Sequence, residues 1–265
     1  YILTVVPQSI LMFPRLFWQA YMNHKMQDGD ECIAYEIEAE GKKILFDMGQ
    51  TNLFAENAAK LSVDLTKVDL AILSHGHYDH GGGMQRFLEI NKQAPVYINR
   101  NAFGEFFNGP EKYIGLDLTF KEETRIHWTG DIQKLSNTME LVTYNQETSE
   151  YANYGQGLLQ KDENGFQPDS FRHEQYLLIE ENGKRILVSG CSHKGIVNLA
   201  LWARPDVVVG GFHLKKVEDE AELTVLADVL KKMNIKFYTC HCTGKWQFEQ
   251  LKKVMDKLMF LIIGL

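Results

Sequence analysis

The chain of 265 residues carries 28 Lys and Arg against 35 Asp and Glu, which gives a formal net charge of −7. Nucleic-acid affinity comes largely from Lys and Arg that neutralise phosphates, so this acidic balance argues against a nucleic-acid partner. With 45% hydrophobic and 24% charged residues, the chain can bury a substantial core. We therefore expect a single domain over residues 1–265 that acts on a small molecule.

The cysteines and the apolar runs bear on the cellular compartment. Four cysteines, Cys32, Cys191, Cys240 and Cys242, form no disulfide-rich framework, and no leader with a basic start and an apolar middle opens the chain. The most apolar run, residues 258–265, is far shorter than the roughly 20 residues that span a bilayer, and we expect it to be a buried strand. These features predict a cytoplasmic protein with no membrane partner.

In the first hundred residues, several short strands are expected before any long helix. Apolar and β-branched runs predict strands at residues 2–6, 32–37, 44–46, 68–73 and 95–98. Helical spacing of apolar residues predicts helices at residues 52–61, 83–91 and 102–107.

The middle of the chain is less regular. Between about residues 108 and 169 the periodicity is poor and turn residues are common, with short strand candidates at residues 125–128 and 139–144. Long irregular stretches within a compact domain are often binding loops, and disorder is the alternative. We expect a loop-rich segment at about 108–169 that borders the functional site.

The last third of the chain alternates strands with amphipathic helices. Predicted strands at residues 176–179 and 185–188 are joined through Glu181-Asn182-Gly183, a strong hairpin signal. Further strands are predicted at residues 206–209 and 237–240, and helices at residues 195–203, 218–233 and 246–258. The sequence thus predicts an α/β fold with two β-rich halves and helices outside them.

The most informative segment is residues 74–83, Ser-His-Gly-His-Tyr-Asp-His-Gly-Gly-Gly, at the end of a predicted apolar strand. It places four potential metal ligands, His75, His77, Asp79 and His80, within six residues. Neutral imidazole and carboxylate suit a divalent zinc-like ion, and a catalytic site keeps one coordination position open. The alternative is a solvated polar turn.

The spacing within this segment fits two metal positions. In a tight loop the first two histidines can aim their rings the same way, while Asp79 and His80 point to a second position a few ångströms off. We expect the glycines at residues 76 and 81–83 to adopt the unusual backbone dihedrals that this convergence requires.

The segment resembles the His-x-His-x-Asp-His signature of the metallo-β-lactamase superfamily. Residues 43–49 resemble the first motif of that superfamily, a strand that ends in an Asp, here Asp47. Three later segments, at residues 188–198, 210–214 and 240–244, are similar to a narrower branch, which contains dihydropterin ribofuranosyl-aminobenzene phosphate synthases and bacterial homologues of unassigned substrate. The resemblance implies a four-layer α/β/β/α metallo-β-lactamase-like sandwich.

Three predicted strands each deliver histidine at or just beyond their C-terminal ends, which is the physical argument that these side chains converge. The ligand sets that the resemblance implies are His75, His77 and His193 for a first metal, and Asp79, His80 and His241 for a second. An isolated histidine at a strand end is more often a surface or hydrogen-bonded residue, and only the strong cluster favours ligation by His193 and His241.

The chain departs from the superfamily at two positions. Cys191 stands where most relatives carry an Asp that bridges two metals, so a thiolate ligand, a weaker second site, a single metal and a plain buried Cys all stay open. The separate upstream histidine of the superfamily falls near His173, which therefore competes with His193 for one role. We favour His193.

Two further features lie near the predicted ligands. His213 follows the strand predicted at residues 206–209, and it could orient substrate, donate a proton to a leaving group, or act only as a hydrogen-bonded neighbour of the ligands. Cys240 and Cys242 flank His241, and on extended chain they would share the face opposite to it. A Cys-rich structural zinc site is therefore the weaker alternative.

These residues predict a metal-dependent hydrolase that uses a metal-bound hydroxide on a small, anionic or phosphorylated substrate. Zinc lowers the pKa of bound water from 15.7 to about 7. We expect one or two zinc ions, with other divalent metals possible, and catalytic roles for Asp79 in guiding a proton and for His213 as a donor. Relatives with a redox di-iron site typically carry Glu where His77 stands. The alternatives are a transferase that uses a pterin diphosphate, as the resemblance implies, and a non-catalytic metal-binding module.

Overall fold

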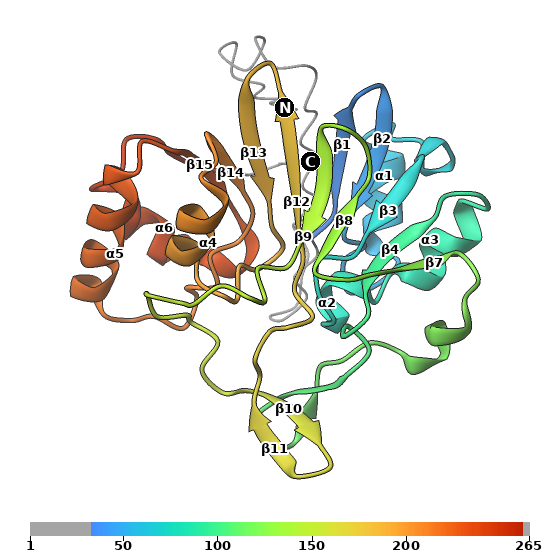
Figure 1. Cartoon of the computed structure of the whole chain (residues 1–265), viewed down its shortest axis with the longest axis horizontal. Coiled ribbons are helices and arrows are strands. Elements are labelled where there is room, and N and C mark those ends of the chain that lie inside the picture. Colours follow the sequence, from blue (N-terminus) through green and yellow to red (C-terminus); the bar gives the residue numbers. More distant parts are fainter. Residues whose placement is uncertain (1–32, 262–265) are drawn as a thin grey trace. The chain divides into compact units, whose positions relative to one another are not determined.

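The computed structural model describes residues 33–261, which divide into two compact units. Unit 1 contains the described residues up to Gly130 together with Leu158–His173, and unit 2 contains Asp131–Gly157 and Glu174–Leu261 (Figure 1). The strand expected at residues 2–6 lies outside the described residues, and so do Cys32 and the last four residues of the run at 258–265. The single domain expected from the sequence stays a prediction.

Unit 1 is built on a five-stranded sheet in which an antiparallel hairpin continues into parallel strands. The strands, in their order across the sheet, are β1 (Tyr35–Ala39), β2 (Lys42–Phe46), β3 (Leu70–Ile72), β4 (Val96–Asn99) and β7 (Ile126–Thr129). Because β2 and β3 are parallel and Phe46 pairs with Ile72, the residues that follow the two strands meet at one edge of the sheet.

Helices cover one face of this sheet and bury alternate residues of its strands. The helical elements of unit 1 are α1 (Leu53–Lys60), η2 (Leu65–Lys67), α2 (Tyr78–Gly81), α3 (Met84–Ile90) and η3 (Leu118–Glu122). Leu45 and Val96 from the strands share a core with Phe54 of α1 and Phe87 of α3. The helices predicted at residues 52–61 and 83–91 are therefore confirmed.

A smaller antiparallel sheet in unit 1 corrects two expectations. Its strands, in order, are β11 (Gly165–Pro168), β10 (Leu158–Asp162), β5 (Glu105–Asn108) and β6 (Lys112–Tyr113). The helix expected at residues 102–107 is wrong, because Phe106 and Phe107 alternate between the two faces of β5. Phe106 is fully buried against Leu158 and Phe171, whereas Phe107 packs edge-on against Phe166. The segment at 108–169, expected to be loop-rich, thus contains three strands of this sheet, β6, β10 and β11.

Unit 2 is built on a seven-stranded mixed sheet. Its strands, in order, are β16 (Leu258–Phe260), β15 (Lys236–Thr239), β14 (Val207–Val209), β13 (Lys184–Val188), β12 (Tyr176–Glu181), β9 (Met139–Val142) and β8 (Ile132–Lys134). Neighbours from β8 to β13 are antiparallel and those from β13 to β16 are parallel. The C-terminal ends of β13, β14 and β15 therefore lie along one edge of the sheet.

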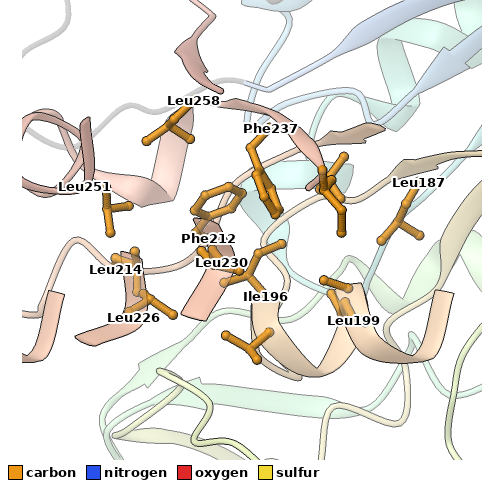
Figure 2. Packing of buried hydrophobic residues seen from close by; sticks show 14 of the residues in the cluster. Leu187, Ile196, Leu199, Phe212, Leu214, Leu226, Leu230, Phe237, Leu251 and Leu258 are labelled. Atoms are coloured by element: carbon orange, nitrogen blue, oxygen red, sulfur yellow. The ribbon is translucent and has the colours of Figure 1, made fainter. Parts of the chain in front are cut away.

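Three helices cover one face of this sheet: α4 (Ile196–Ala203), α5 (Glu220–Lys232) and α6 (Lys245–Lys252), with a short turn η4 (His241–Thr243) before the last. Figure 2 shows their shared core, in which Leu230 and Leu251 from the helices lie with Phe237 of β15 and with Phe212. Each unit combines a large sheet with helices, so the predicted α/β class is confirmed. The stacking of four layers stays a prediction.

The hairpin predicted in unit 2 is confirmed, register included. β12 and β13 pair with Glu181 opposite Lys184, which leaves Asn182 and Gly183 as a two-residue turn. Their φ angles of 50° and 71° are the positive values that a type I′ turn requires.

The end of unit 2 departs from the sequence expectation. The helix predicted at residues 246–258 ends at Lys252, and Leu258 begins β16, whose pairing with β15 places it opposite Phe237. The apolar run at residues 258–265 is thus a strand over its first three residues, in which Leu258 is buried and Met259 and Phe260 are partly buried. Among residues 33–261, no helix has both the length and the apolar character needed to cross a bilayer.

Helix α5 provides a matched test of the core of unit 2. Leu230 is fully buried, while Val225 on the same helix is 65% exposed. We expect Leu230→Ala to lower the free energy of unfolding by about 2–5 kcal/mol, because the change removes buried apolar surface and leaves a cavity. Val225→Ala should change it by no more than about 0.5 kcal/mol. Chemical denaturation followed by circular dichroism measures both, and equal effects would contradict this packing.

Candidate functional site

The loop at residues 74–83 brings three imidazoles together in unit 1. His75, His77 and His80 are 1%, 4% and 0% exposed. The ring centroid of His75 lies 4.6 Å from that of His77 and 4.1 Å from that of His80. Asp79 is half-buried on the one-turn helix α2, with a carboxylate oxygen 3.7 Å from Nε2 of His80. The burial of the rings contradicts a solvated polar turn and fits the predicted ligand cluster.

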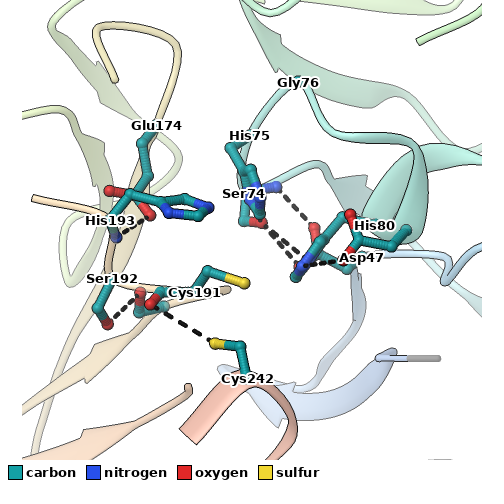
Figure 3. Close-up of polar contacts among 12 residues, drawn as sticks. Asp47, Ser74, His75, Gly76, His80, Glu174, Cys191, Ser192, His193 and Cys242 are labelled. Carbon is teal, nitrogen blue, oxygen red and sulfur yellow. Dashed lines mark hydrogen bonds and ion pairs between the residues drawn. The ribbon is translucent and has the colours of Figure 1, made fainter. Parts of the chain in front are cut away.

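The carboxylate of Asp47, directly after β2, holds this loop in place (Figure 3). It accepts hydrogen bonds from the backbone N–H of Ser74 at 2.7 Å, the hydroxyl of Ser74 at 2.8 Å and Nδ1 of His80 at 2.7 Å. Nδ1 of His75 lies 2.8 Å from the same hydroxyl and donates a hydrogen bond to it, because the hydroxyl hydrogen points to Asp47. Both rings therefore use Nδ1 for hydrogen bonding, and Nε2 is the nitrogen that would bind a metal.

The glycines of the loop act through close packing rather than through unusual dihedrals. A Cβ on Gly76 would lie 2.1 Å from the carbonyl oxygen of Ala102, and one on Gly82 would lie 2.1 Å from that of Gln50. Neither glycine has a positive φ, so the expected dihedral role is wrong for both. At these positions glycine is needed because two backbone segments touch.

His173 and Asp169 form a second polar group in unit 1. His173 accepts the backbone N–H of Gly76 on Nδ1 at 3.0 Å, and its Nε2 lies 3.0 Å from the carboxylate of Asp169. The same carboxylate lies 3.8 Å from Nε2 of His77. Burial opposes ionisation of Asp169, but its hydrogen bond to His173 and the nearby imidazole of His77 outweigh burial and hold the pKa of the carboxyl well below its usual range.

This arrangement bears on the competition between His173 and His193. Both ring nitrogens of His173 take part in hydrogen bonds, so the residue is suited to fix the loop and His77. His77, Asp169 and His173 nevertheless place one possible ligand atom each within 4.8 Å of one another. Asp169 was missed by sequence reasoning, because nothing local marks an Asp four residues before a histidine as its partner.

Unit 2 gathers its candidate residues on three loops, which follow the parallel strands β13, β14 and β15. Cys191, His193 and His213 place one ligand atom each within 4.8 Å of one another, and so do Cys191, His241 and Cys242. The rings of His193 and His213 are 4.3 Å apart between centroids. Within unit 2, His193 therefore lies beside His213, and His241 lies beside Cys191 and Cys242. The convergence of His193 and His241 with the loop at residues 74–83, expected from the sequence, stays a prediction.

Each of the three loops contains a non-glycine residue in the left-handed region. The φ angles are 58° for Ser192, 51° for His213 and 51° for His241. In unit 1, Asp47 has a φ of 63°. Such conformations cost of order 1–3 kcal/mol each and persist where the surroundings impose them, which is common at functional sites.

A buried carboxylate, Glu174, holds the loop that carries His193. It accepts the backbone N–H of His193 at 2.8 Å (Figure 3). It also accepts the backbone N–H of Lys194 at 3.2 Å and a hydrogen bond from the hydroxyl of Tyr176. Burial raises the pKa of Glu174, although Lys194 and these hydrogen bonds oppose the shift. Lys194 in turn donates to the carbonyl oxygen of Thr143 at 2.6 Å. No sequence motif marks Glu174 for this role.

Cys242 does not lie where the sequence suggested. Residues 241–243 form the 3₁₀ turn η4 rather than extended chain, so the thiol of Cys242 lies beside His241 and Cys191 instead of on the opposite face. The backbone N–H of His213 donates to its sulfur at 3.3 Å. Burial opposes ionisation, but hydrogen bonds with Cys191 and His213 and the neighbouring imidazoles lower the pKa of the Cys242 thiol well below its usual value.

The donor chemistry of both units fits a divalent metal ion. Imidazole nitrogens, carboxylates and thiols are the ligands that zinc-like ions take. In addition, the buried Nδ1 of His213 has no hydrogen-bond partner among residues 33–261. A buried imidazole nitrogen in that state is costly unless a ligand satisfies it.

Comparison with known proteins identifies the family. The family model of the metallo-beta-lactamase superfamily matches residues 28–140. A 7,8-dihydropterin-6-methyl-4-(beta-D-ribofuranosyl)-aminobenzene-5'-phosphate synthase of Methanocaldococcus jannaschii is 32% identical over 253 residues, which are 84% of this chain and 85% of that protein. The chain belongs to the metallo-β-lactamase superfamily.

Two further relatives agree with this membership. An uncharacterized protein of the same organism is 29% identical over 251 residues, which are 89% of this chain and 90% of that protein. A crystal structure described as a metal-dependent hydrolase of the beta-lactamase superfamily matches with a TM-score of 0.74 and 26% sequence identity. The match covers 90% of this chain and 93% of the chain in that structure. The predicted superfamily and fold class are confirmed. The assignment of individual ligands, His193 and His241 included, stays a prediction.

The low pKa of Asp169 predicts a pH-dependent contribution to stability. Its folded pKa lies below the unfolded value of about 3.9, so its contribution is present above that value and is lost as the pH falls through the folded pKa. In metal-free protein, Asp169→Asn should lower the free energy of unfolding by about 1.5–3 kcal/mol above pH 5, because it removes hydrogen bonds to a charged group. The difference from wild type should shrink below about pH 4.

Urea denaturation at several pH values measures this difference. Glu163→Gln, an exposed acid on the turn between β10 and β11, is the control and should show little difference at any pH. A difference for Asp169→Asn that stays constant from neutral pH to about pH 2 would contradict the prediction.

Proposed function

We propose that this chain is a metal-dependent hydrolase that acts on a small anionic or phosphorylated molecule. The observation that carries the proposal is the buried cluster of His75, His77 and His80, with two of the rings oriented through the carboxylate of Asp47. Such an oriented set of imidazoles is what a metal site requires. Membership of the superfamily supports the same chemistry, since a relative with a solved structure is described as a metal-dependent hydrolase.

The proposed ligands are those expected from the sequence: His75, His77, Asp79, His80, His193 and His241. Zinc is the proposed metal, as one or two ions, because imidazole, carboxylate and thiol are donors that zinc takes. When bound, the metal would lower the pKa of a coordinated water to about 7 and so supply a nucleophile at neutral pH.

The remaining residues have proposed roles in moving protons and binding charge. Asp79 is half-buried beside His80, so it can accept a proton at its carboxylate as well as bind metal. His213 is partly exposed and packs against His193, which suits it to donate a proton to a leaving group. Two exposed lysines, Lys215 and Lys216, lie two and three positions after His213 and favour an anionic substrate in a chain whose net charge is −7.

A transferase is the second candidate function. The relative at 32% identity is a synthase, and the two chains align over more than four fifths of each. In that case the same residues would bind the metal, and the metal would hold a pterin diphosphate instead of activating water. A non-catalytic metal-binding module is the third alternative.

We also propose that the protein works in the cytoplasm on a small molecule, without a membrane or nucleic-acid partner. Cys191, Cys240 and Cys242 form no disulfide among residues 33–261, which fits a reducing compartment. The acidic net charge fits poorly with phosphate-backbone binding.

Removal of one proposed ligand tests the metal assignment. His75→Ala should abolish activity and lower the bound metal measured by elemental analysis, because the change removes a first-metal ligand. His127→Ala is the matched control: this histidine of the same unit is exposed on β7, and its loss should leave metal content and activity unchanged. Full metal content in the His75→Ala protein would refute the assignment.

Product analysis separates the two enzymatic candidates. The zinc-loaded protein is incubated with simple phosphodiesters, with lactones, and with a pterin diphosphate together with an aminobenzene ribofuranosyl phosphate. Incorporation of one oxygen atom from ¹⁸O-labelled water into a product supports the hydrolase. Formation of the joined pterin product with release of unlabelled diphosphate refutes hydrolysis and supports the transferase.

A further inference from the structure

Unit 2 contains a pair of buried thiols that the proposed hydrolytic reaction does not use. Cys191 is 2% exposed and Cys242 is 6% exposed, and they form no disulfide (Figure 3). The imidazole of His241, 8% exposed, completes the group. The ligand atoms of the three residues lie within 4.8 Å of one another, which is close enough for one ion to contact all three.

The surroundings of Cys242 are shaped to hold its sulfur. A Cβ on Gly211 would lie 2.4 Å from Sγ of Cys242, so the absence of a side chain at Gly211 makes room for the sulfur. The backbone N–H of His213 donates to the same sulfur at 3.3 Å. Backbone N–H groups that point at sulfur stabilise the negative charge of a thiolate and tune metal sites that contain one.

Hydrogen bonds of Thr243 and Gln247 hold the turn that carries Cys242 in place. The hydroxyl of Thr243 accepts the backbone N–H of Phe212 at 2.9 Å and is hydrogen-bonded to the hydroxyl of Thr239. The side-chain amide of Gln247 donates to the carbonyl oxygens of Lys215 and Val217 at 2.9 and 3.0 Å. The loops after β14 and β15 are therefore held to each other and to α6, so the thiol and the imidazole are preorganised.

We propose that Cys191, His241 and Cys242 together bind one thiophilic divalent ion, with Cys242 as a ligand in its own right. Two thiols and one imidazole form a donor set that a catalytic zinc site uses while a fourth position stays open. Soft sulfur donors favour Zn²⁺ over Mg²⁺ or Mn²⁺. The inference shares His241 with the proposed hydrolytic site, but it requires neither the loop at residues 74–83 nor any hydrolysis.

A pair of cysteines that only fills the core is the competing explanation, since free Cys is among the most buried residue types. That explanation does not require an imidazole beside the two sulfurs. The φ of 51° at His241 is unfavourable for a residue with a Cβ, and the turn that imposes it places an imidazole beside both sulfurs. Core packing alone does not require this unfavourable backbone conformation at His241.

Cobalt substitution tests sulfur ligation directly in the wild-type protein. Thiolate ligands give cobalt(II) an intense charge-transfer absorption in the near ultraviolet, and imidazole and carboxylate ligands do not. The full-length chain, stripped with a chelator and reloaded with cobalt, should show this absorption with the intensity of two thiolates per protein chain. A cobalt-loaded protein that lacks the absorption overturns the proposal.

Two matched cysteine variants attribute the signal to Cys242. Cys242→Ser should reduce the absorption to about half and weaken zinc binding by more than about 100-fold, because loss of a residue that merely orients a ligand already costs about 10–100-fold. Cys240→Ser removes an equally buried thiol two positions earlier and should change neither quantity. Equal losses in the two variants would overturn the assignment of Cys242. Far-UV circular dichroism confirms that each variant is folded.

The cobalt experiment tests the thiolate site separately from the proposed hydrolase activity. A sulfur-to-cobalt band in a protein that hydrolyses none of the tested substrates leaves this inference standing and refutes the hydrolase. Hydrolysis by a cobalt-loaded protein without the band supports the hydrolase and overturns the thiolate site.

Discussion

The carboxylate of Asp47 is the constraint on which the histidine loop depends. It is fully buried and accepts the backbone N–H and the hydroxyl of Ser74 together with Nδ1 of His80. Hydrogen bonds to a charged group contribute about 1.5–3 kcal/mol each, so their combined loss would release the start of the loop and one candidate ligand together. The parallel pairing of β2 with β3 places the carboxylate there, so the geometry of His80 is set by a residue 33 positions earlier in the chain.

Local signals made several features of the chain predictable. The Asn182-Gly183 turn fixes its own hairpin, because both residues tolerate positive φ and the turn sets the register of β12 and β13. The apolar run before residue 74 predicted a strand that ends at the ligands, and β3 does so. The helices at residues 52–61 and 83–91 were predictable because their apolar faces repeat at helical spacing.

What could not be predicted depends on contacts between distant residues. Phe106 lies in a strand because β10, some fifty residues later, pairs with it. Glu174 and Asp169 have no motif, since their roles follow from which backbone N–H groups and imidazoles approach them. Cys242 was assigned to the wrong face because the extended chain assumed around His241 is a 3₁₀ turn, a difference of backbone geometry that alternation along a strand cannot reveal.

The described residues of unit 1 form two segments of the chain that are separated by a segment of unit 2. The backbone N–H of Gly76 is held by His173, 97 residues later, and the intervening Asp131–Gly157 belongs to unit 2. On the ribosome, the amino-terminal unit therefore cannot finish its histidine loop until a stretch of the other unit has already emerged. A protein cut after Gly130 would lack the hydrogen bond from Gly76 to His173. Contacts between residues so far apart in the chain slow folding.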